Sequence, residues 1–473
     1  MAKGKVKKGF ASYLLVLFLA VIATFLIIIA VMLFSPFKNI LGFQYFTYKF
    51  DEKVTHATAE TENEVFNFQT LNELNINCDY ANVKVERYYN VDTPAIRFEN
   101  TMSGFARSDH DTEFKYEIYY NDASKTELNI DVHEPEGFLF FSKNLTISIL
   151  IPTSLSYTLE NTDLNIINNT GNVYIGNNIK AINLDGEDFR NYITIGNLNV
   201  KTNKGKTLIR TYTNENFNSL VIKTEKGKIE SQIDLNIAEN LEIYSSKGEI
   251  EFKKLVVAKS DAVTLNLKNS EFYTPYLKAN VNLTIKEGYF DVDYLSGSLI
   301  SNDAVEQMST ATLTIKEFDG YMSLPYANKS KVNLGKVSAT SQIYIHATEG
   351  DIKIDEMNGN VAKLETTKGD INIETNGTDI DVKTTSGNIK IKYNDLNDGN
   401  QIDIESNSGD VDFKVGATKR MDLKVLNNKG EYRTDGYVKI SGLDVMPESE
   451  VHINGGGQKV VIATNGSVNV ELI

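Results

Sequence analysis

The chain of 473 residues has no tryptophan, one cysteine and 7 prolines. A single cysteine cannot form an internal disulfide. Cys78 lies in the strand-like stretch NINCDYANV, so it is predicted to be a small buried apolar residue, with a reactive thiol as the alternative. Basic residues are outnumbered, 48 against 63 acidic ones, which gives a net charge of -15. This balance argues against a nucleic-acid-binding protein, because phosphate contacts need a basic patch.

Charged residues are absent between residues 9 and 37, and the apolar run Tyr13–Phe34 has the length that a helix needs to cross a bilayer. We therefore predict a transmembrane signal anchor at 12–35, preceded by a basic cytoplasmic tail at 1–11. A cleaved signal peptide is the alternative, but its apolar core is usually about 7–15 residues long. The positive-inside rule then places the C-terminal bulk outside the cell. The tail carries Lys3, Lys5, Lys7 and Lys8.

Residues 36–65 are predicted to be a juxtamembrane linker, because much of this segment is polar and lacks alternation. Aromatic residues gather between Phe37 and Tyr48. Such residues commonly lie at the lipid headgroups just outside a membrane span. The alternative is that some of them belong to the first strand of the following domain, and the sequence leaves both open.

From about residue 66 onward, apolar and polar residues alternate with period two, as half-buried strands do. No convincing helical periodicity follows residue 50, so the fold is predicted to be all-β. We divide it into an N-terminal β region at 66–165, which caps the fold, and a β-solenoid at 166–473.

The solenoid prediction rests on a repeat of two or three polar residues, a glycine, a polar residue and an apolar-x-apolar triplet. Thr366–Asp395 contains it twice, as TTKGDINI and TTSGNIKI. Consecutive copies lie 18 to 22 residues apart, a period that indicates stacked coils. Ser270 marks a degenerate copy. The repeat glycines are Gly171, Gly205, Gly227, Gly248, Gly288, Gly350, Gly369, Gly387, Gly409, Gly430 and Gly466.

Each coil is expected to bury its alternate apolar residues, such as Ile371 and Ile373, and to expose the residue between them, Asn372. Glycine at the corner is expected because it supplies a backbone conformation that a side chain would disfavour. Some 14 coils at a strand spacing of about 4.8 Å would form a rod roughly 65–70 Å long.

The stretches FQTLNELNINCDYANVKVERYY and LTISILIP, followed by the glycine coils, resemble the adhesin-like β-strand-repeat family of the DUF4097 type. The resemblance covers about residues 66–473 and departs from the family pattern between Ser296 and Val337, where an insertion or a bulged coil is expected. It implies a right-handed parallel β-helix-like solenoid that is often exported or membrane-anchored. Some relatives are associated with envelope-stress systems.

Candidate chemistry is sparse. Glycoside hydrolysis needs two carboxylates about 5–10 Å apart. The available carboxylates fall at equivalent outward positions of successive coils, which favours a solvated face over one catalytic site. They are Asp351, Asp355, Asp370, Asp381, Asp403, Asp410 and Asp412.

Metal ligands are equally scattered. His346 lies near Glu349 and Asp351, but the chain lacks an H-x-x-H spacing and a second cysteine, so a zinc site is not predicted. The loop 393–405 offers Asp395, Asn397, Asp398 and Asn400 as oxygen ligands for calcium, and a plain Asn/Asp turn is the favoured interpretation. We predict no cofactor and no metal.

The sequence therefore predicts a non-enzymatic, single-pass cell-surface protein whose adhesin-like solenoid lies outside the membrane and has binding or structural roles at the envelope. The expected partners are the membrane and an envelope polymer or a surface protein, and not nucleic acid. One alternative is an accessory protein of an envelope-stress signalling system. A second is a polysaccharide-active β-helix enzyme, although the chain has only seven arginines for such a site.

Overall fold

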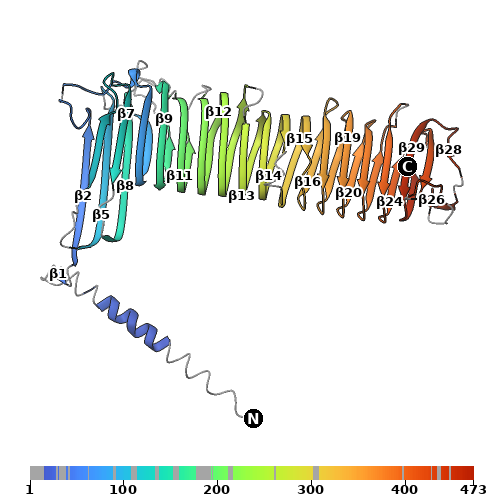
Figure 1. Ribbon diagram of the computed structural model, residues 1–473, viewed down its shortest axis with the longest axis horizontal. Helices are drawn as coiled ribbons and strands as arrows, with labels where there is room; N and C mark the ends of the chain where they lie inside the picture. Colours follow the sequence, from blue (N-terminus) through green and yellow to red (C-terminus); the bar gives the residue numbers. More distant parts are fainter. Residues whose placement is uncertain are drawn as a thin grey trace, which may run out of the picture.

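The computed structural model shows one long row of strands with a separate N-terminal helical segment (Figure 1). It describes residues 15–27, 30, 39–40, 43–61, 63–88, 92–107, 114–133, 138–152, 159–176, 193, 195–210, 217–259, 263–301, 308–396, 399–427, 429–433, 438–446 and 449–473.

The helical segment covers residues 15–27 of the predicted membrane anchor. The predicted tail at 1–11 and the rest of the anchor, apart from residue 30, lie outside the described residues. Within the described part of the chain, no helix combines the length and hydropathy that a membrane span requires.

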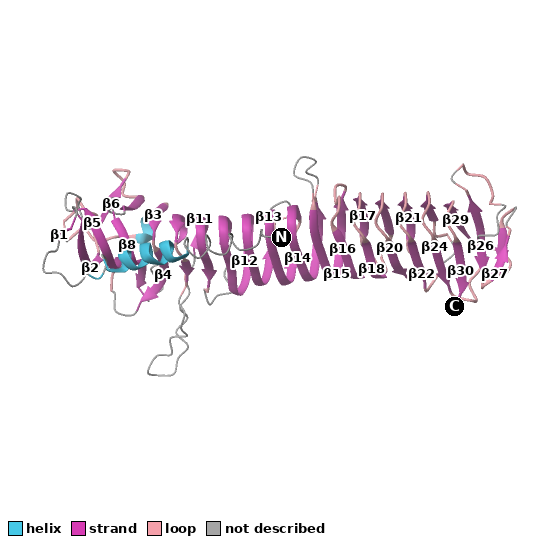
Figure 2. Ribbon diagram, turned by 90° about the horizontal axis from the view of Figure 1, so that it is seen from below, coloured by secondary structure: helices cyan, strands magenta, loops and turns pink. Residues whose placement is uncertain are grey.

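The strands form a rod in which each coil contributes two strand segments, one before and one after a sharp corner (Figures 1 and 2). We call the resulting surfaces the pre-corner face and the post-corner face. Along the middle of the rod, the hydrogen bonding between strands continues around the corner, so one strand contains segments of both faces. These strands are β11 (Ile195–Ile209), β12 (Phe217–Val257), β13 (Val263–Lys278), β14 (Val281–Ile300) and β15 (Thr310–Leu324).

Toward both ends of the rod the two faces are built from separate short strands. The pre-corner strands are β7 (Glu127–His133), β3 (Glu73–Tyr80), β9 (Leu159–Thr170), β17 (Gln342–Ala347), β19 (Val361–Thr366), β21 (Asp379–Thr384), β23 (Ile402–Ser406), β29 (Gln458–Thr464) and β25 (Met421–Leu426). The post-corner strands are β8 (Phe138–Pro152), β4 (Asn82–Tyr88), β10 (Val173–Ile175), β16 (Lys331–Val337), β18 (Ile352–Met357), β20 (Ile371–Thr375), β22 (Ile389–Tyr393), β24 (Val411–Val415), β30 (Val468–Leu472) and β26 (Val438–Ile440).

Neighbouring coils pair in parallel and in register. Ile371 lies opposite Ile389, which lies opposite Val411 on the next coil. These inward residues are at most 1% exposed, and the core is a continuous column of such side chains along the rod. The all-β fold predicted from the alternation and the stacked coils predicted from the repeat are therefore present, and Cys78 is buried among them as predicted.

The corner is a column of small residues that stack directly on one another. A Cβ added to Gly205 would lie 1.8 Å from the carbonyl oxygen of Gly171, and one added to Gly387 would lie 1.9 Å from that of Gly369. The column runs through Ala81, Gly171, Gly205, Gly227, Gly248, Ser270, Gly288, Ala311, Ser330, Gly350, Gly369, Gly387, Gly409 and Gly466. At the glycine positions successive backbones approach too closely for a side chain, whereas four coils of the column carry alanine or serine.

This reason differs from the predicted one. Among the repeat glycines in the column, φ is positive only at Gly171, Gly205 and Gly288, so a left-handed backbone is not the general requirement. Gly430 is not part of the column. It has a φ of 80° in the turn after β25, and a Cβ there would meet nothing within 4 Å.

A buried hydroxyl precedes the corner by three residues in several coils. The Gly369, Gly387 and Gly409 amides donate to the hydroxyl oxygens of Thr366, Thr384 and Ser406 at 3.0, 3.0 and 2.9 Å. Buried amides need such partners because an unbonded one costs about 1–3 kcal/mol. These side chains fix the corner.

At the N-terminal end the strand order differs from the chain order. β3 lies between β7 and β9, and β4 lies between β8 and β10, so the first coil in the sequence is the second in the rod. The outermost strands run antiparallel: β6 (Lys115–Tyr120) covers β7, and β5 (Ala95–Arg107) covers β8. The solenoid thus already begins at β3, before the predicted boundary at residue 166.

A further strand, β2 (Phe43–Val54), pairs antiparallel with β5, and the short β1 (Asn39–Ile40) pairs with β2. The predicted linker at 36–65 is therefore a strand over these residues. Phe46, Tyr48 and Phe50 alternate along β2 and pack against the core, which explains why this segment is ordered as a strand. A 3-10 helix, η1 (Phe68–Thr70), leads into β3.

At the C-terminal end the strand order again differs from the chain order, and the last coil in the sequence is not the last coil in the rod. β29 and β30, the last strands in the chain, insert between β23 and β25 and between β24 and β26. Gly466 consequently stacks on Gly409, although 57 residues separate them. The antiparallel strands β27 (Leu443–Val445) and β28 (Val451–Ile453) cover β26 and β25. Both ends of the rod therefore finish in antiparallel strands.

Candidate functional site

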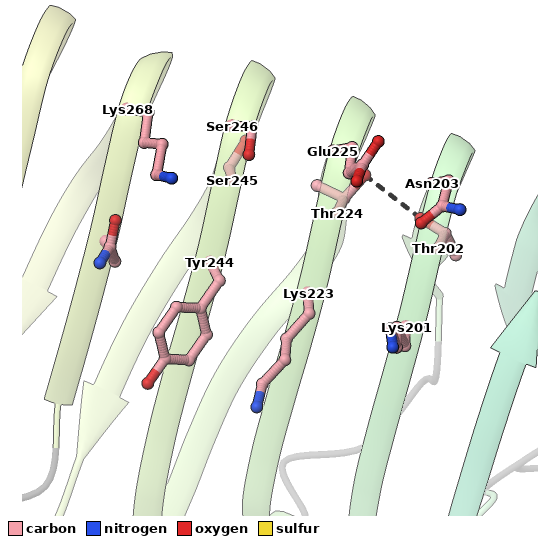
Figure 3. A pocket seen from close by; sticks show the side chains of 11 residues that line it. Lys201, Thr202, Asn203, Lys223, Thr224, Glu225, Tyr244, Ser245, Ser246 and Lys268 are labelled. Atoms are coloured by element: carbon pink, nitrogen blue, oxygen red, sulfur yellow. Dashed lines mark hydrogen bonds between the residues drawn. The ribbon is translucent and has the colours of Figure 1, made fainter. Parts of the chain in front are cut away.

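The pre-corner face carries a hollow of about 300 Å³ on β11, β12 and β13 (Figure 3). Two rows of side chains border it. Lys201, Lys223 and Tyr244 occupy one row, four residues before the corner of their coils, and Asn203, Glu225, Ser246 and Lys268 occupy the other, two residues before it. We call this the first hollow.

A second hollow of about 260 Å³ lies on β17, β19, β21 and β23. It has the same two rows at the same repeat positions. His346, Glu365, Lys383 and Glu405 lie four residues before the corner, and Thr367, Thr385 and Asn407 lie two residues before it. Both hollows occupy equivalent repeat positions on the pre-corner face, and we call the two together the furrow; the coils with corners at Gly288, Ala311 and Ser330 lie between them.

The furrow exists because the residue between the two rows is small and points inward. In the first hollow this residue is Thr202, Thr224 or Ser245, each at most 6% exposed. The hydroxyl of Thr202 donates to that of Thr224 at 3.2 Å, which binds adjacent coils beneath the floor (Figure 3). The outward rows therefore stand on either side of a buried hydroxyl column.

The electrostatics of the two hollows differ. In the second, Lys383 lies 3.4 Å from Glu405, and His346 lies 3.9 Å from Glu365. In the first, the ammonium of Lys223 lies 4.9 Å from the centre of the Tyr244 ring, a cation–π contact. Burial, followed by the charge of the Glu242 carboxylate and a hydrogen bond to it, raises the pKa of Tyr244.

The carboxylates considered as catalytic candidates mostly stack between coils. Asp370 accepts the amide of Asn388 at 2.7 Å, and Asp410 accepts that of Ser467 at 2.8 Å. Asp351 does the same for Asp370 at 3.1 Å. The remaining ones contact side chains: Asp355 with Lys353, Asp381 with Lys363 and Lys383, Asp403 with Gln401, and Asp412 with Asn469. On the coils of Asp351, Asp370 and Asp410 the polar residue directly after the corner accepts a hydrogen bond from a backbone amide of the next coil.

The loop considered for calcium is only partly described. Asn397 and Asp398 lie outside the described residues. Asp395 pairs with Lys419, and Asn400 donates to the carbonyl of Gly377 at 2.9 Å and to Asp379 at 3.1 Å. These contacts support the turn interpretation of the loop.

Sequence reasoning missed a cluster on the C-terminal cap. Asp422, Glu450 and His452 bring ligand atoms within 4.8 Å of one another, an arrangement that could hold a metal ion. The cluster arises because β28 runs antiparallel to β25 with His452 opposite Asp422. Two ion pairs already use these groups: His452 with Asp422 at 2.6 Å, and Glu450 with Lys424 at 3.4 Å. Residues so far apart in the chain carry no sequence signal for this contact.

The His452–Asp422 pair predicts a pH dependence. The hydrogen bond to the Asp422 carboxylate, with a smaller contribution from Glu450, raises the pKa of His452 above its ordinary value of about 6.5. The stability that the charged histidine contributes is therefore complete below that ordinary value and is lost as pH rises through the raised pKa.

We expect Asp422→Asn to lower the pKa of His452 in an NMR titration of its ring protons. Glu450→Gln is the matched control and should lower that pKa less, because its effect is only through space. Equal shifts in the two variants would contradict the assignment of Asp422 as the main cause.

Comparison with known proteins finds a family match within the C-terminal part of the chain. Residues 303–471 match the model of the Toastrack DUF4097 family. No curated protein and no solved structure matches the chain. The family match supports the DUF4097 resemblance and its repeated β-strand architecture. The small-residue column continues N-terminal to the matched segment as far as Ala81, so the same coil construction extends beyond the match.

Proposed function

We propose that this protein is a non-enzymatic, single-pass membrane protein whose solenoid stands outside the cell and binds an extended partner at the envelope. The uncharged run 9–37 supports the anchor. The DUF4097 match and the long rod support a surface-exposed binding or structural module.

The observation that carries the binding role is the furrow. Its two hollows are bordered by the same repeat positions on consecutive coils, which are spaced about 4.8 Å apart. A compact small molecule would contact only two or three coils. A linear partner aligned with the rod would instead meet equivalent side chains on each coil in turn, so we favour a polymer or an extended segment of a surface protein.

A capture experiment tests this role. The full chain in detergent is incubated with solubilised envelope material, with and without EDTA. Ser246→Trp and Thr385→Trp fill the first and second hollows, and Asn372→Trp on the post-corner face is the matched control. We expect saturable capture by the wild type and the control and reduced capture by a furrow variant. Equal capture by all the variants, or none by the wild type, would reject the furrow as the binding surface. Loss of capture with EDTA would identify a requirement for a divalent cation.

The anchor has a separate test, made sensitive by the absence of natural tryptophan. Tyr45 on β2 packs against Phe105 with ring centres 5.4 Å apart and lies about ten residues after the apolar run, within roughly 35 Å of chain. In vesicles whose headgroups carry a nitroxide quencher, we expect Tyr45→Trp to be quenched more strongly than Tyr321→Trp in the middle of the rod. Equal quenching would contradict an anchor at 12–35.

A further inference from the structure

We infer that the first hollow binds a linear polyanion, a polymer with regularly spaced phosphate or carboxylate groups, along the rod axis. This inference deepens the proposed envelope-binding function and rests on it. It starts from a local excess of positive charge on a protein whose net charge is -15.

Three lysines line the first hollow, and three more lie directly before the corners of the same coils; all six are exposed. Within the part of the chain that the structure describes, none of them forms an ion pair. They occupy the two furrow rows and the position directly before the corner, and Glu225 is the acidic residue in the lining. The six are Lys201, Lys204, Lys223, Lys226, Lys247 and Lys268.

Their unpaired state does not follow from a shortage of carboxylates on the same coils. On the post-corner face, Lys206 lies 2.6 Å from Glu230, and Lys228 lies 2.7 Å from Glu251. These coils therefore pair their lysines on one face and leave them unpaired at the furrow. The segregation makes the first hollow a site of positive potential.

The lysines also stand next to one another across strands. Lys201 lies opposite Lys223, and Lys204 lies opposite Lys226. Like charges directly opposite on neighbouring strands destabilise a sheet. An anion bound between them would remove this repulsion and gain charge-assisted hydrogen bonds.

The arrangement favours a polymer over a single small anion. The six ammonium groups are distributed over successive coils about 4.8 Å apart, so one phosphate would contact only a few of them. The amide of Asn203 and the hydroxyl of Ser246 lie among the lysines and can donate to oxygens of the polymer backbone (Figure 3).

The second hollow provides an internal comparison, because Lys383 in its lining and the lysines on the neighbouring positions of its coils are paired with carboxylates. Lys383 lies 3.4 Å from Glu405, Lys363 lies 3.6 Å from Glu365, and Lys368 lies 3.1 Å from Glu349. The polyanion is thus assigned to the first hollow and not to the whole furrow.

The test measures binding of the full chain in detergent to labelled long-chain polyphosphate and to polygalacturonate, with neutral dextran as the reference. One triple variant replaces Lys201, Lys223 and Lys268 with Gln. The matched control replaces Lys363, Lys368 and Lys383 with Gln, so both variants lose the same net charge.

We expect the wild type to bind at least one polyanion and not dextran, and added salt to weaken the binding. The first-hollow variant should bind about tenfold more weakly and the control within about twofold of the wild type. Binding of polyphosphate alone would define the ligand as a phosphate polymer, and binding of polygalacturonate alone as a carboxylate polymer.

Three results would overturn the inference: equal loss in both triple variants, which would indicate a general charge effect; binding of neither polyanion; and binding to phosphatidylglycerol vesicles without binding to either polymer. Capture of envelope material without polyanion binding would reject this inference and leave the proposed function intact. If the wild type neither captured envelope material nor bound a polyanion, the proposed function and this inference would both be rejected.

Discussion

Gly369→Ala is expected to destabilise the rod by about 3 kcal/mol or more, a large effect for one methyl group. The added Cβ would lie 1.9 Å from the carbonyl oxygen of Gly350 and 2.5 Å from its carbonyl carbon. That carbonyl belongs to the backbone of the neighbouring coil, so rotation of a side chain cannot relieve the overlap. The corner must open, which separates strands that are otherwise paired in register. Chemical denaturation followed by circular dichroism measures the loss.

Two other glycines serve as controls for this substitution. Gly416→Ala should change stability by less than about 0.5 kcal/mol, because the nearest atom to its Cβ would be a lysine side-chain carbon at 3.4 Å. Gly430→Ala should cost about 1–2 kcal/mol, since φ is 80° but the surrounding space is open. If Gly369→Ala cost no more than Gly430→Ala, close stacking at the corner would not be the reason for the repeat.

The spacing of these glycines explains how far sequence reasoning reaches. Polar-apolar alternation predicts the buried and exposed faces, because side chains in a strand alternate by necessity, and Ile371 and Ile373 are buried accordingly. The 18–22-residue period predicts stacked coils. The sequence does not distinguish the two reasons for a regular glycine spacing, because a close approach between the backbones of successive coils and a left-handed turn both place glycine at the corner.

The two ends of the rod could not be predicted from the repeat. The insertion of β29 and β30 between earlier and later coils is a matter of strand order, which local patterns do not encode. Gly430 shows the consequence: it has the repeat signature but lies in the turn of the capping segment, whereas Gly466 joins the column. The Asp422–His452 contact forms because β28 pairs antiparallel with β25 in the same capping segment, and no local sequence pattern predicts it.

The furrow can be predicted from the sequence only in part. The strings KTNKGK and KTEKGK, which begin at Lys201 and Lys223, are visible repeats. They predict lysines in register once the corner is known, and the structure pairs them as neighbours. The absence of acidic partners depends on which face each glutamate occupies. That assignment requires the coil geometry, so the charge of the first hollow emerges only in three dimensions.

Arg433→Ala is expected to loosen the C-terminal cap by about 2–4 kcal/mol. Arg433 is 2% exposed and lies after β25, where its guanidinium donates to the carbonyl of Thr464 at 3.1 Å and to that of Gly466. It therefore joins the cap to the inserted last coil at its corner. Alanine would leave these acceptors without their donor and would leave a cavity. Hydrogen exchange should show faster exchange in β29 and β30 than in β20 and β22.

Arg97→Ala is the matched control at the opposite end of the rod. Arg97 pairs with Asp51 at 2.9 Å, but its side chain is 33% exposed, and surface pairs contribute at most about 1 kcal/mol. Arg433→Lys should recover part of the stability, because both carbonyls accept from a single guanidinium nitrogen, Nη1, and an ammonium nitrogen also carries several donors. Uniform acceleration of exchange along the whole rod in Arg433→Ala would contradict a local capping role. It would mean that the coils unfold as one cooperative unit rather than through neighbour-by-neighbour contacts.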